Sequence, residues 1–385
     1  MTRSAEPARL DALDGVRGLA ILAVLVMHAA FYVSQILIPL AVDRGFEATA
    51  AVRGIAESYM RVGVLGWCGV DVFFVLSGFL ITGILVRTKG SPHYFRNFYA
   101  RRALRIFPLY YVVIALLLFV LARMPLADGE IPAHLFYYQN LWYAFSGHPA
   151  ADVARSVTWS LAIEEQFYLV WPALVLLVSR RGLRAACVMV VLGAVAARFA
   201  SLQAGVVQTH FVTWCRLDAL AAGALLAVVP LPPRWLGVAA TLGGAGGLVA
   251  ELALTGQSMP ETMMMQRYGL IAALALAVGV LVLARHDGVF ARACGFGPLR
   301  SLGRYSYCVY LVHIPVSELL TRQARQHELT AVLAEPLLRW PALILLVIAV
   351  FTALSLVLAW AVGWLSWRLF ESPVLRWKDR FPNGG

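Results

Sequence analysis

The stretch GVRGLAILAVLVMHAAFYVSQILIP, residues 15–39, decides the fold class of this chain. It is apolar over slightly more than the roughly 20 residues that a helix needs to cross a bilayer, and its basic side chains are Arg17 and His28. Asp11 and Asp14 precede it where a cleavable signal peptide would carry a basic segment. The stretch therefore predicts a transmembrane helix rather than a leader.

The rest of the chain has the same character. Of its 385 residues, 61% are hydrophobic and 14% are charged, whereas soluble domains carry about 45–50% and about 25%. This balance excludes a soluble enzyme, a disordered protein and a disulfide scaffold, and the five cysteines show no CxxC spacing that would indicate a metal site. We predict an all-α, polytopic membrane protein with about ten transmembrane helices, at residues 15–39, 64–86, 107–122, 157–178, 185–201, 212–229, 236–254, 268–284, 302–320 and 341–368.

The net charge of +11 is explained by topology. The basic residues lie in short gaps between apolar segments and not along one stripe, so we expect no nucleic-acid partner. With the N-terminus inside, the inner segments hold 21 Lys and Arg and the outer segments hold 10, a bias that orients membrane proteins. We predict cytoplasmic termini in the cytoplasmic membrane, a single transmembrane domain over residues 10–373 and a short basic tail over residues 374–385.

Arg17 and His28 are 11 residues apart, which is three helical turns. Both therefore project from one face of the first helix, with His28 roughly 16 Å deeper in the membrane. Histidine is the side chain best suited to accept and return a proton near neutral pH. The alternatives are a snorkelling anchor for Arg17 and a packed interhelical hydrogen bond for His28.

Further ionisable residues fall at a similar depth in other predicted helices. A charge near the bilayer centre costs a few kcal/mol or more, so such residues are usually functional. They predict the lining of an internal polar cavity, and structural ion pairs between helices are the alternative. Arg216 and Asp218 are two residues apart and point to nearly opposite faces, so they cannot simply neutralise each other. The set consists of Asp71, Glu164, Glu165, Arg216, Asp218 and His313.

A basic segment over residues 87–105 carries six Lys and Arg with interleaved aromatic residues. We expect it to form an amphipathic helix at the membrane interface. Arg102 and Arg105 are spaced i, i+3, so both guanidinium groups face one way, as the oxygens of a phosphate or pyrophosphate require. A patch held by anionic lipid head groups is the alternative.

Seven segments, in order over about residues 10–373, resemble the acyltransferase 3 family of membrane-bound O-acyltransferases. They are LDALDGVRGLAILAVLVMH, GVDVFFVLSGFLITGILV, FYARRALRIFPLYY, SVTWSLAIEEQFYLVWP, RLDALAAGALLA, LGRYSYCVYLVHIPV and FESP. The resemblance implies about ten transmembrane helices, a cytoplasmic acyl-CoA donor, and transfer to a hydroxyl of a carbohydrate, a glycolipid or a glycosylated small molecule. We expect no metal. Some relatives carry an added extracytoplasmic esterase-like domain, which we do not expect here because the chain ends at Gly385.

The resemblance also implies roles for particular residues. The family's Arg-x10-His pattern matches Arg17 and His28, and its cytoplasmic Arg-x-x-Arg matches Arg102 and Arg105. Its acidic residue matches Glu164 or Glu165, and we favour Glu165.

A mechanism follows that agrees with the chemistry of these groups. Arg102, Arg105 and Arg101, with Arg17, are expected to hold the phosphates of coenzyme A. His28 then acts as general base on the acceptor hydroxyl, or becomes acylated itself, with Glu165 orienting its imidazole. The developing oxyanion is expected to be stabilised by a cation or by one of three side chains, which are Tyr305, Ser306 and Tyr310.

Two other functions use the same features. A secondary transporter also places ionisable residues near the midplane, although no inverted repeat stands out. A lipid- or phosphate-sensing protein would use residues 87–105 but leaves His28 and Glu165 buried without a purpose. The aromatic residues at 137–143, expected on the outer side, suit stacking on a sugar ring or an interfacial aromatic belt equally well.

Overall fold

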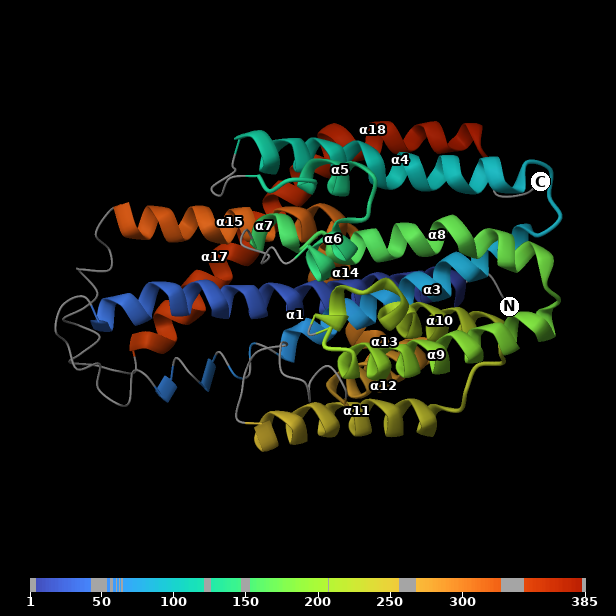
Figure 1. Ribbon diagram of the computed structural model, residues 1–385, viewed down its shortest axis with the longest axis horizontal. Coiled ribbons are helices and arrows are strands. Elements are labelled where there is room, and N and C mark those ends of the chain that lie inside the picture. Colours follow the sequence, from blue (N-terminus) through green and yellow to red (C-terminus); the bar gives the residue numbers. More distant parts are fainter. Residues whose placement is uncertain are drawn as a thin grey trace.

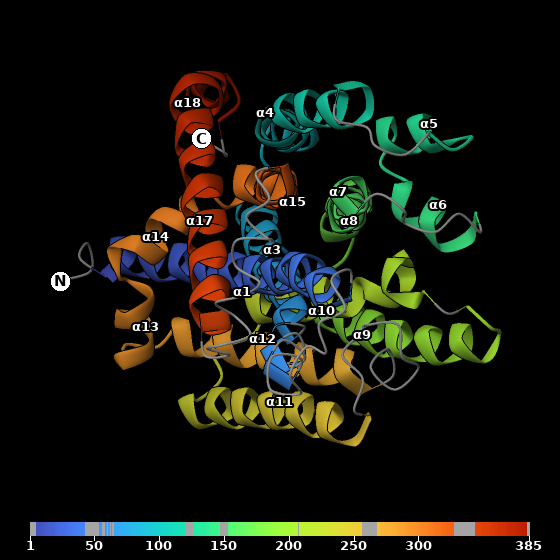
Figure 2. The ribbon, with the colours of Figure 1, turned by 90° about the vertical axis from the view of Figure 1, so that its left-hand side faces the viewer.

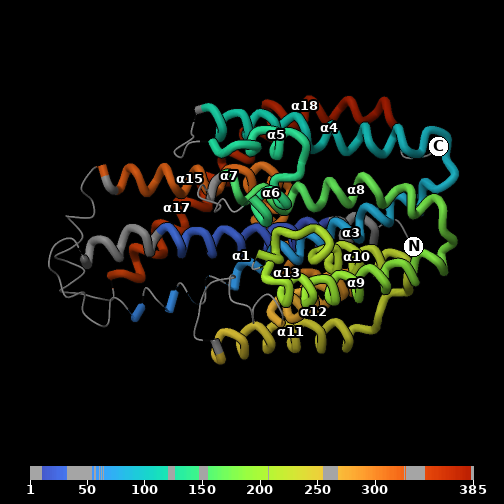
Figure 3. Tube along the Cα trace, viewed as in Figure 1, coloured from blue at the N-terminus to red at the C-terminus, as the bar shows by residue number. Residues whose placement is uncertain are grey.

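The computed structural model describes residues 5–42, 54–55, 58–59, 61, 63, 65–120, 126–146, 153–206, 208–255, 268–326 and 343–382 (Figure 3). Every regular element within these ranges is a helix, and none is a strand. Most long helices run along the longest axis of the molecule, and both termini lie toward the same end (Figure 1).

Each of the ten predicted spans overlaps a described helix. Seven helical segments are long and apolar enough to cross a membrane, and they contain all of these helices except α10, α12 and α15. The all-α, polytopic fold is therefore confirmed, whereas the count of ten and the cytoplasmic position of the termini stay predictions. In order, the helices are α1 (Ala5–Val42), α3 (Cys68–Thr88), α4 (Tyr94–Ala115), α8 (Trp159–Leu177), α9 (Arg180–Gln203), α10 (Thr213–Val228), α11 (Arg234–Thr255), α12 (Leu270–Ala284), α15 (Ser306–Gln326) and α17 (Leu343–Ser366).

Two boundaries differ from the prediction. The basic segment is not a separate interface helix, because α4 begins at Tyr94 and runs without a break through Pro108 into a π-helical turn, η2 (Leu116–Val120). A proline inside a membrane helix is tolerated where neighbouring groups satisfy the backbone that it frees. The ninth span is two helices, α14 (Gly297–Arg304) and α15, which meet at Tyr305.

Shorter elements complete the fold. Figure 2 shows α6 beside α7 and α8, with α5 next to α6 and near the end of α4. After α17, the chain turns and its last helices lie beside α4, as both ribbon views show (Figures 1 and 2). The short elements are η1 (Leu65–Trp67), α5 (Glu130–Leu135), α6 (Gln139–Phe145), α7 (Val153–Ser156), η3 (Thr209–Phe211), α13 (Val289–Cys294), η5 (Trp367–Glu371), α18 (Ser372–Leu375) and η6 (Arg376–Arg380).

Close backbone contact joins α3 to α10 at the centre of the bundle. A Cβ atom added at Gly78 would overlap the carbonyl oxygen of Leu220, and one added at Gly223 would overlap that of Val75. Small residues allow membrane helices to approach in this way. The contact brings the polar residues of α3 within reach of those of α10.

Candidate active site

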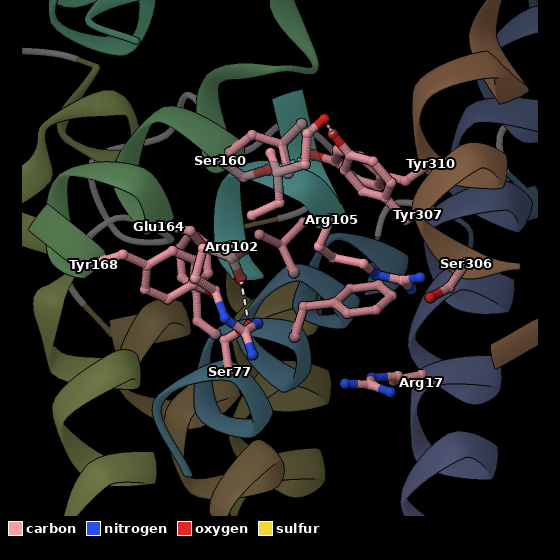
Figure 4. Close-up of a pocket in the computed structure, with 15 residues that line it drawn as sticks. Arg17, Ser77, Arg102, Arg105, Ser160, Glu164, Tyr168, Ser306, Tyr307 and Tyr310 are labelled. Carbon is pink, nitrogen blue, oxygen red and sulfur yellow. Dashed lines mark hydrogen bonds between the residues drawn. The ribbon is translucent and has the colours of Figure 1, made fainter. Parts of the chain in front are cut away.

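A cavity of about 130 Å³ lies between α1, α3, α4, α8 and α15 (Figure 4). Its apolar wall includes Phe73, Phe74 and Ile106. The sequence predicted a polar cavity lined by six ionisable residues, and of these six Glu164 is the one that lines this cavity. Its polar lining consists of Arg17, Ser77, Arg102, Arg105, Ser160, Glu164, Tyr168, Ser306, Tyr307 and Tyr310.

Three guanidinium groups from two helices line this cavity. Arg17 comes from α1, and Arg102 and Arg105 come from α4, where their i, i+3 spacing turns both toward the cavity. Arg17 is 3.0 Å from a carboxylate oxygen of Asp14, and Arg105 is 3.8 Å from one of Glu371. The buried Nε atom of Arg102 has no hydrogen-bond partner within the described part of the chain. The cationic wall therefore keeps bonding capacity for an anion.

The two adjacent glutamates of α8 occupy different positions. Glu164 lines the cavity, where its Oε1 atom accepts a 2.7 Å hydrogen bond from the hydroxyl of Ser77 (Figure 4). Glu165 is not among the lining residues, and its Oε1 atom is buried without a hydrogen-bond partner among the described residues. The geometry thus places the carboxylate of Glu164 in contact with the cavity.

His28 does not line the cavity but forms a pair with His313 beside it. The Nδ1 atom of His28 lies 3.2 Å from the Nε2 atom of His313, and the two ring centroids are 4.8 Å apart. Tyr310 links this pair to the cavity, because it lines the cavity and its ring centroid is 5.7 Å from that of His313. The histidine pair therefore lies about one helical turn beyond the end of the cavity.

The hydrogen bonds of the pair define its tautomers. The Nδ1 atom of His313 is 2.7 Å from the carbonyl oxygen of Tyr310. A carbonyl only accepts, so Nδ1 of His313 donates and its Nε2 atom accepts when the ring is neutral. The Nδ1 atom of His28 lies 2.9 Å from the carbonyl oxygen of Val24 and also faces the Nε2 atom of His313, so it carries the proton. This assignment leaves the Nε2 atom of His28 with a free lone pair, as a general base requires.

Tyr310 and Ser160 form the end of the cavity nearest the histidine pair. The Tyr310 hydroxyl donates a 2.7 Å hydrogen bond to the carbonyl oxygen of Val157, so it accepts the 2.7 Å hydrogen bond from Ser160. Ser306 also lines the cavity, and no described residue forms a hydrogen bond with its hydroxyl. Tyr305 instead packs against the rings of Trp360 and Trp367.

The other predicted cavity residues form two ion pairs next to the cavity. Arg216 pairs with Asp71 of α3 at 3.0 Å, and both side chains are 1% exposed. Asp218 pairs with Arg198 of α9. Arg216 and Asp218 thus face different helices, as their spacing predicted. The guanidinium of Arg216 does not line the cavity but lies 5.5 Å from the ring centre of Phe74, which does.

Two arginines have contacts that were not predicted from the sequence. Arg198 was counted among the outer basic residues, but it is fully buried within α9. Arg198 lies within the predicted span 185–201, and this position was the one sign in the sequence that its side chain could be buried. Arg101, expected to hold phosphate, donates hydrogen bonds to the carbonyl oxygens of Lys378 at 3.1 Å and Phe381 at 2.9 Å.

The sequence profile of an acyltransferase domain matches residues 10–361. The chain belongs to the acyltransferase 3 family. It is similar to the peptidoglycan O-acetyltransferase OatA of Listeria monocytogenes, with 27% identity over 81% of this chain and 50% of the relative. It is also similar to the O-acetyltransferase OatA of Staphylococcus aureus, with 27% identity over 69% of this chain and 49% of the relative. The chain spans about half the length of these relatives, and no solved structure matches it.

Proposed function

We propose that this protein is an O-acyltransferase of the cytoplasmic membrane. It moves an acyl group, most simply acetyl, from cytoplasmic acyl-CoA to a hydroxyl of a carbohydrate, a glycolipid or a glycosylated small molecule. The observation that carries the proposal is the cavity itself, with guanidinium groups from two helices in its wall and the histidine pair one helical turn beyond Tyr310. The names of both relatives support acetyl as the group. The name of the Listeria monocytogenes relative, a peptidoglycan O-acetyltransferase, supports a cell-wall carbohydrate as the acceptor class.

The donor enters from the cationic wall. Its phosphates carry several negative charges and bind to the guanidinium groups of Arg17, Arg102 and Arg105 in charge-assisted hydrogen bonds. Its pantetheine arm is uncharged and extends along the cavity toward Tyr310, with the acyl group leading. The acyl group reaches His28 only if the Tyr310 side chain moves. This movement connects the cavity to the histidine pair.

The acceptor hydroxyl oxygen attacks the acyl carbonyl carbon while the Nε2 atom of His28 takes the hydroxyl proton. The tetrahedral intermediate then breaks its C–S bond, and the proton passes from His28 to the departing CoA sulfur. His313 accepts a hydrogen bond from Nδ1 of His28 throughout, a role that the sequence analysis gave to Glu165. In this proposal Glu165 acts instead on the charge of Arg102, and Ser306 supplies a free hydroxyl for the oxyanion.

Purified full-length protein in proteoliposomes tests the proposal. CoA thiol release from acetyl-CoA is followed with muropeptide fragments or soluble glycans as acceptors, and the products are examined for the added acetyl mass. We expect His28→Ala to lower kcat by about 10²–10⁴-fold, and Arg102→Ala to raise the KM for acetyl-CoA by about tenfold. Arg96→Ala, on the exposed side of the same helix, is the matched control.

Acetyl transfer that survives His28→Ala contradicts the base assignment. Solute uptake by the proteoliposomes without acetyl-CoA, together with no transfer to any acceptor, supports a transporter and refutes the proposal. A trapped acetyl-histidine on His28 replaces direct attack with the relay.

A further inference from the structure

The end of the chain forms a strap along the basic face of α4. We use the name C-terminal strap for residues Trp367–Pro382, which comprise η5, α18 and η6 and lie beside α4 in both ribbon views (Figures 1 and 2). The acyltransferase profile ends at residue 361, before the strap begins. The strap contains the FESP segment, residues 370–373, which is one of the segments that resemble the family. The residues after it, which include Lys378, lie beyond both the profile and these segments.

Specific contacts hold the C-terminal strap to α4. The guanidinium of Arg101 donates to two of its carbonyl oxygens, those of Lys378 and Phe381. The side-chain amide of Asn97 donates to the carbonyl oxygen of Pro382 at 2.9 Å. Arg105 lines the cavity and pairs with Glu371 of the strap, so the strap reaches the edge of the donor cavity.

The hydrogen bond from Arg101 to the carbonyl oxygen of Lys378 holds this residue beside the basic face of α4. The charges of Arg105, Arg102 and Arg101 all act on Lys378, whose side chain is partly buried. No described carboxylate forms an ion pair with Lys378, Arg101 or Arg102. Glu371 offsets part of the charge of Arg105. The charges of Lys378, Arg101 and Arg102 repel one another when no anion is bound, and a polyanion between them reverses the sign of that interaction.

We propose that Lys378 of the C-terminal strap completes, with Arg102 and Arg105, a binding site for the phosphate groups of the acyl-CoA donor. The inference rests on the proposed function for the identity of the donor. Lys378 does not line the cavity, but its charge is compact and lies on a flexible stem, which suits binding to a phosphate held by Arg102 and Arg105. Arg101 is a positioning residue in this site, because its guanidinium holds the backbone that carries Lys378.

Isothermal titration on the full chain in an uncharged detergent tests this site. The ligands are CoA, which carries the phosphates, and pantetheine, which has the same arm without them. We expect Lys378→Ala to weaken CoA binding by about tenfold, the value of one charge-assisted hydrogen bond, and to leave pantetheine binding unchanged. Lys378→Arg keeps the charge and should restore most of the affinity. Arg380→Ala is the matched control, since its guanidinium stacks on Trp377 of the same short helix.

Each other result overturns the inference. If Lys378→Ala binds CoA like the wild type while Arg102→Ala binds it weakly, the strap is not part of the site and the proposed function stands. If Lys378→Ala binds CoA more tightly, the strap competes with the donor. Equal losses for CoA and pantetheine indicate a structural role. If the wild type does not bind CoA, but Lys378→Ala loses binding to nanodiscs that contain phosphatidylglycerol, the phosphate belongs to a lipid and the donor assignment fails as well.

Discussion

Replacing His313 with alanine tests how much this residue contributes to the action of His28. In the proposed mechanism the Nε2 atom of His313 accepts the Nδ1 proton of His28 across 3.2 Å. Truncation removes this acceptor, but the carbonyl oxygen of Val24, at 2.9 Å from the same Nδ1 atom, remains. His28 therefore keeps its tautomer and loses one of two orienting contacts.

The size of the effect follows from this geometry. A hydrogen bond between neutral groups contributes about 0.5–1.5 kcal/mol, and one to a charged group about 1.5–3 kcal/mol. The hydrogen bond from His28 to His313 is between neutral groups at first. It becomes a bond from a charged group when His28 takes the proton of the substrate hydroxyl. The difference of about 1.4 kcal/mol corresponds to about tenfold in kcat. His313→Ala should therefore lower kcat about tenfold at constant KM for acetyl-CoA, less than the loss for His28→Ala.

Initial rates of CoA release at saturating and limiting acetyl-CoA give kcat and KM separately. His313→Gln places an amide oxygen where the Nε2 acceptor was and should recover most of the rate, which a merely structural role of His313 does not explain. Unchanged kcat in His313→Ala refutes the reasoning. So does a loss as large as that of His28→Ala, or a change confined to KM.

Two further predictions concern stability. Asp71→Leu leaves the buried guanidinium of Arg216 without its ion pair and should cost about 3–5 kcal/mol of unfolding free energy, whereas Asp71→Leu combined with Arg216→Met should recover most of it. Denaturant unfolding in detergent micelles measures both, and a double variant no more stable than the single one contradicts the pairing. Burial and the neighbouring Arg155 lower the pKa of His134 from 6.5 to about 3, so the unfolded chain binds more protons between these values and stability should fall as the pH drops from about 6.5 toward about 3. His134→Gln should flatten this part of a plot of melting temperature against pH, and an unchanged slope assigns the acid sensitivity to other groups.

The fold was predictable from the sequence because each span is encoded locally. An apolar run of sufficient length identifies a membrane helix whatever its neighbours are, and the i, i+3 spacing of Arg102 and Arg105 is enough to turn both toward one side. Arg17 was grouped with them through the family resemblance, and all three line the same cavity.

The pairings between helices were harder to predict. His28 and His313 are 285 residues apart, and Arg101 meets the backbone of Phe381 at a separation of 280 residues. Depth along a helix places two residues in the same layer but does not say which helices are adjacent. For this reason the sequence assigned Glu165 to the imidazole, whereas the described neighbour of His28 is a second imidazole.

The two ion pairs of α10 also affect how this helix inserts into the membrane during synthesis. This helix has 16 residues and carries Arg216 and Asp218, each of which would cost about 2.5–3.5 kcal/mol at the centre of an isolated inserting helix. Their partners, Asp71 and Arg198, both precede α10 in the chain. The counter-charges are thus synthesised before the helix that needs them, so a segment too short and too charged to enter the lipid unaided can leave the translocon directly onto helices that neutralise it.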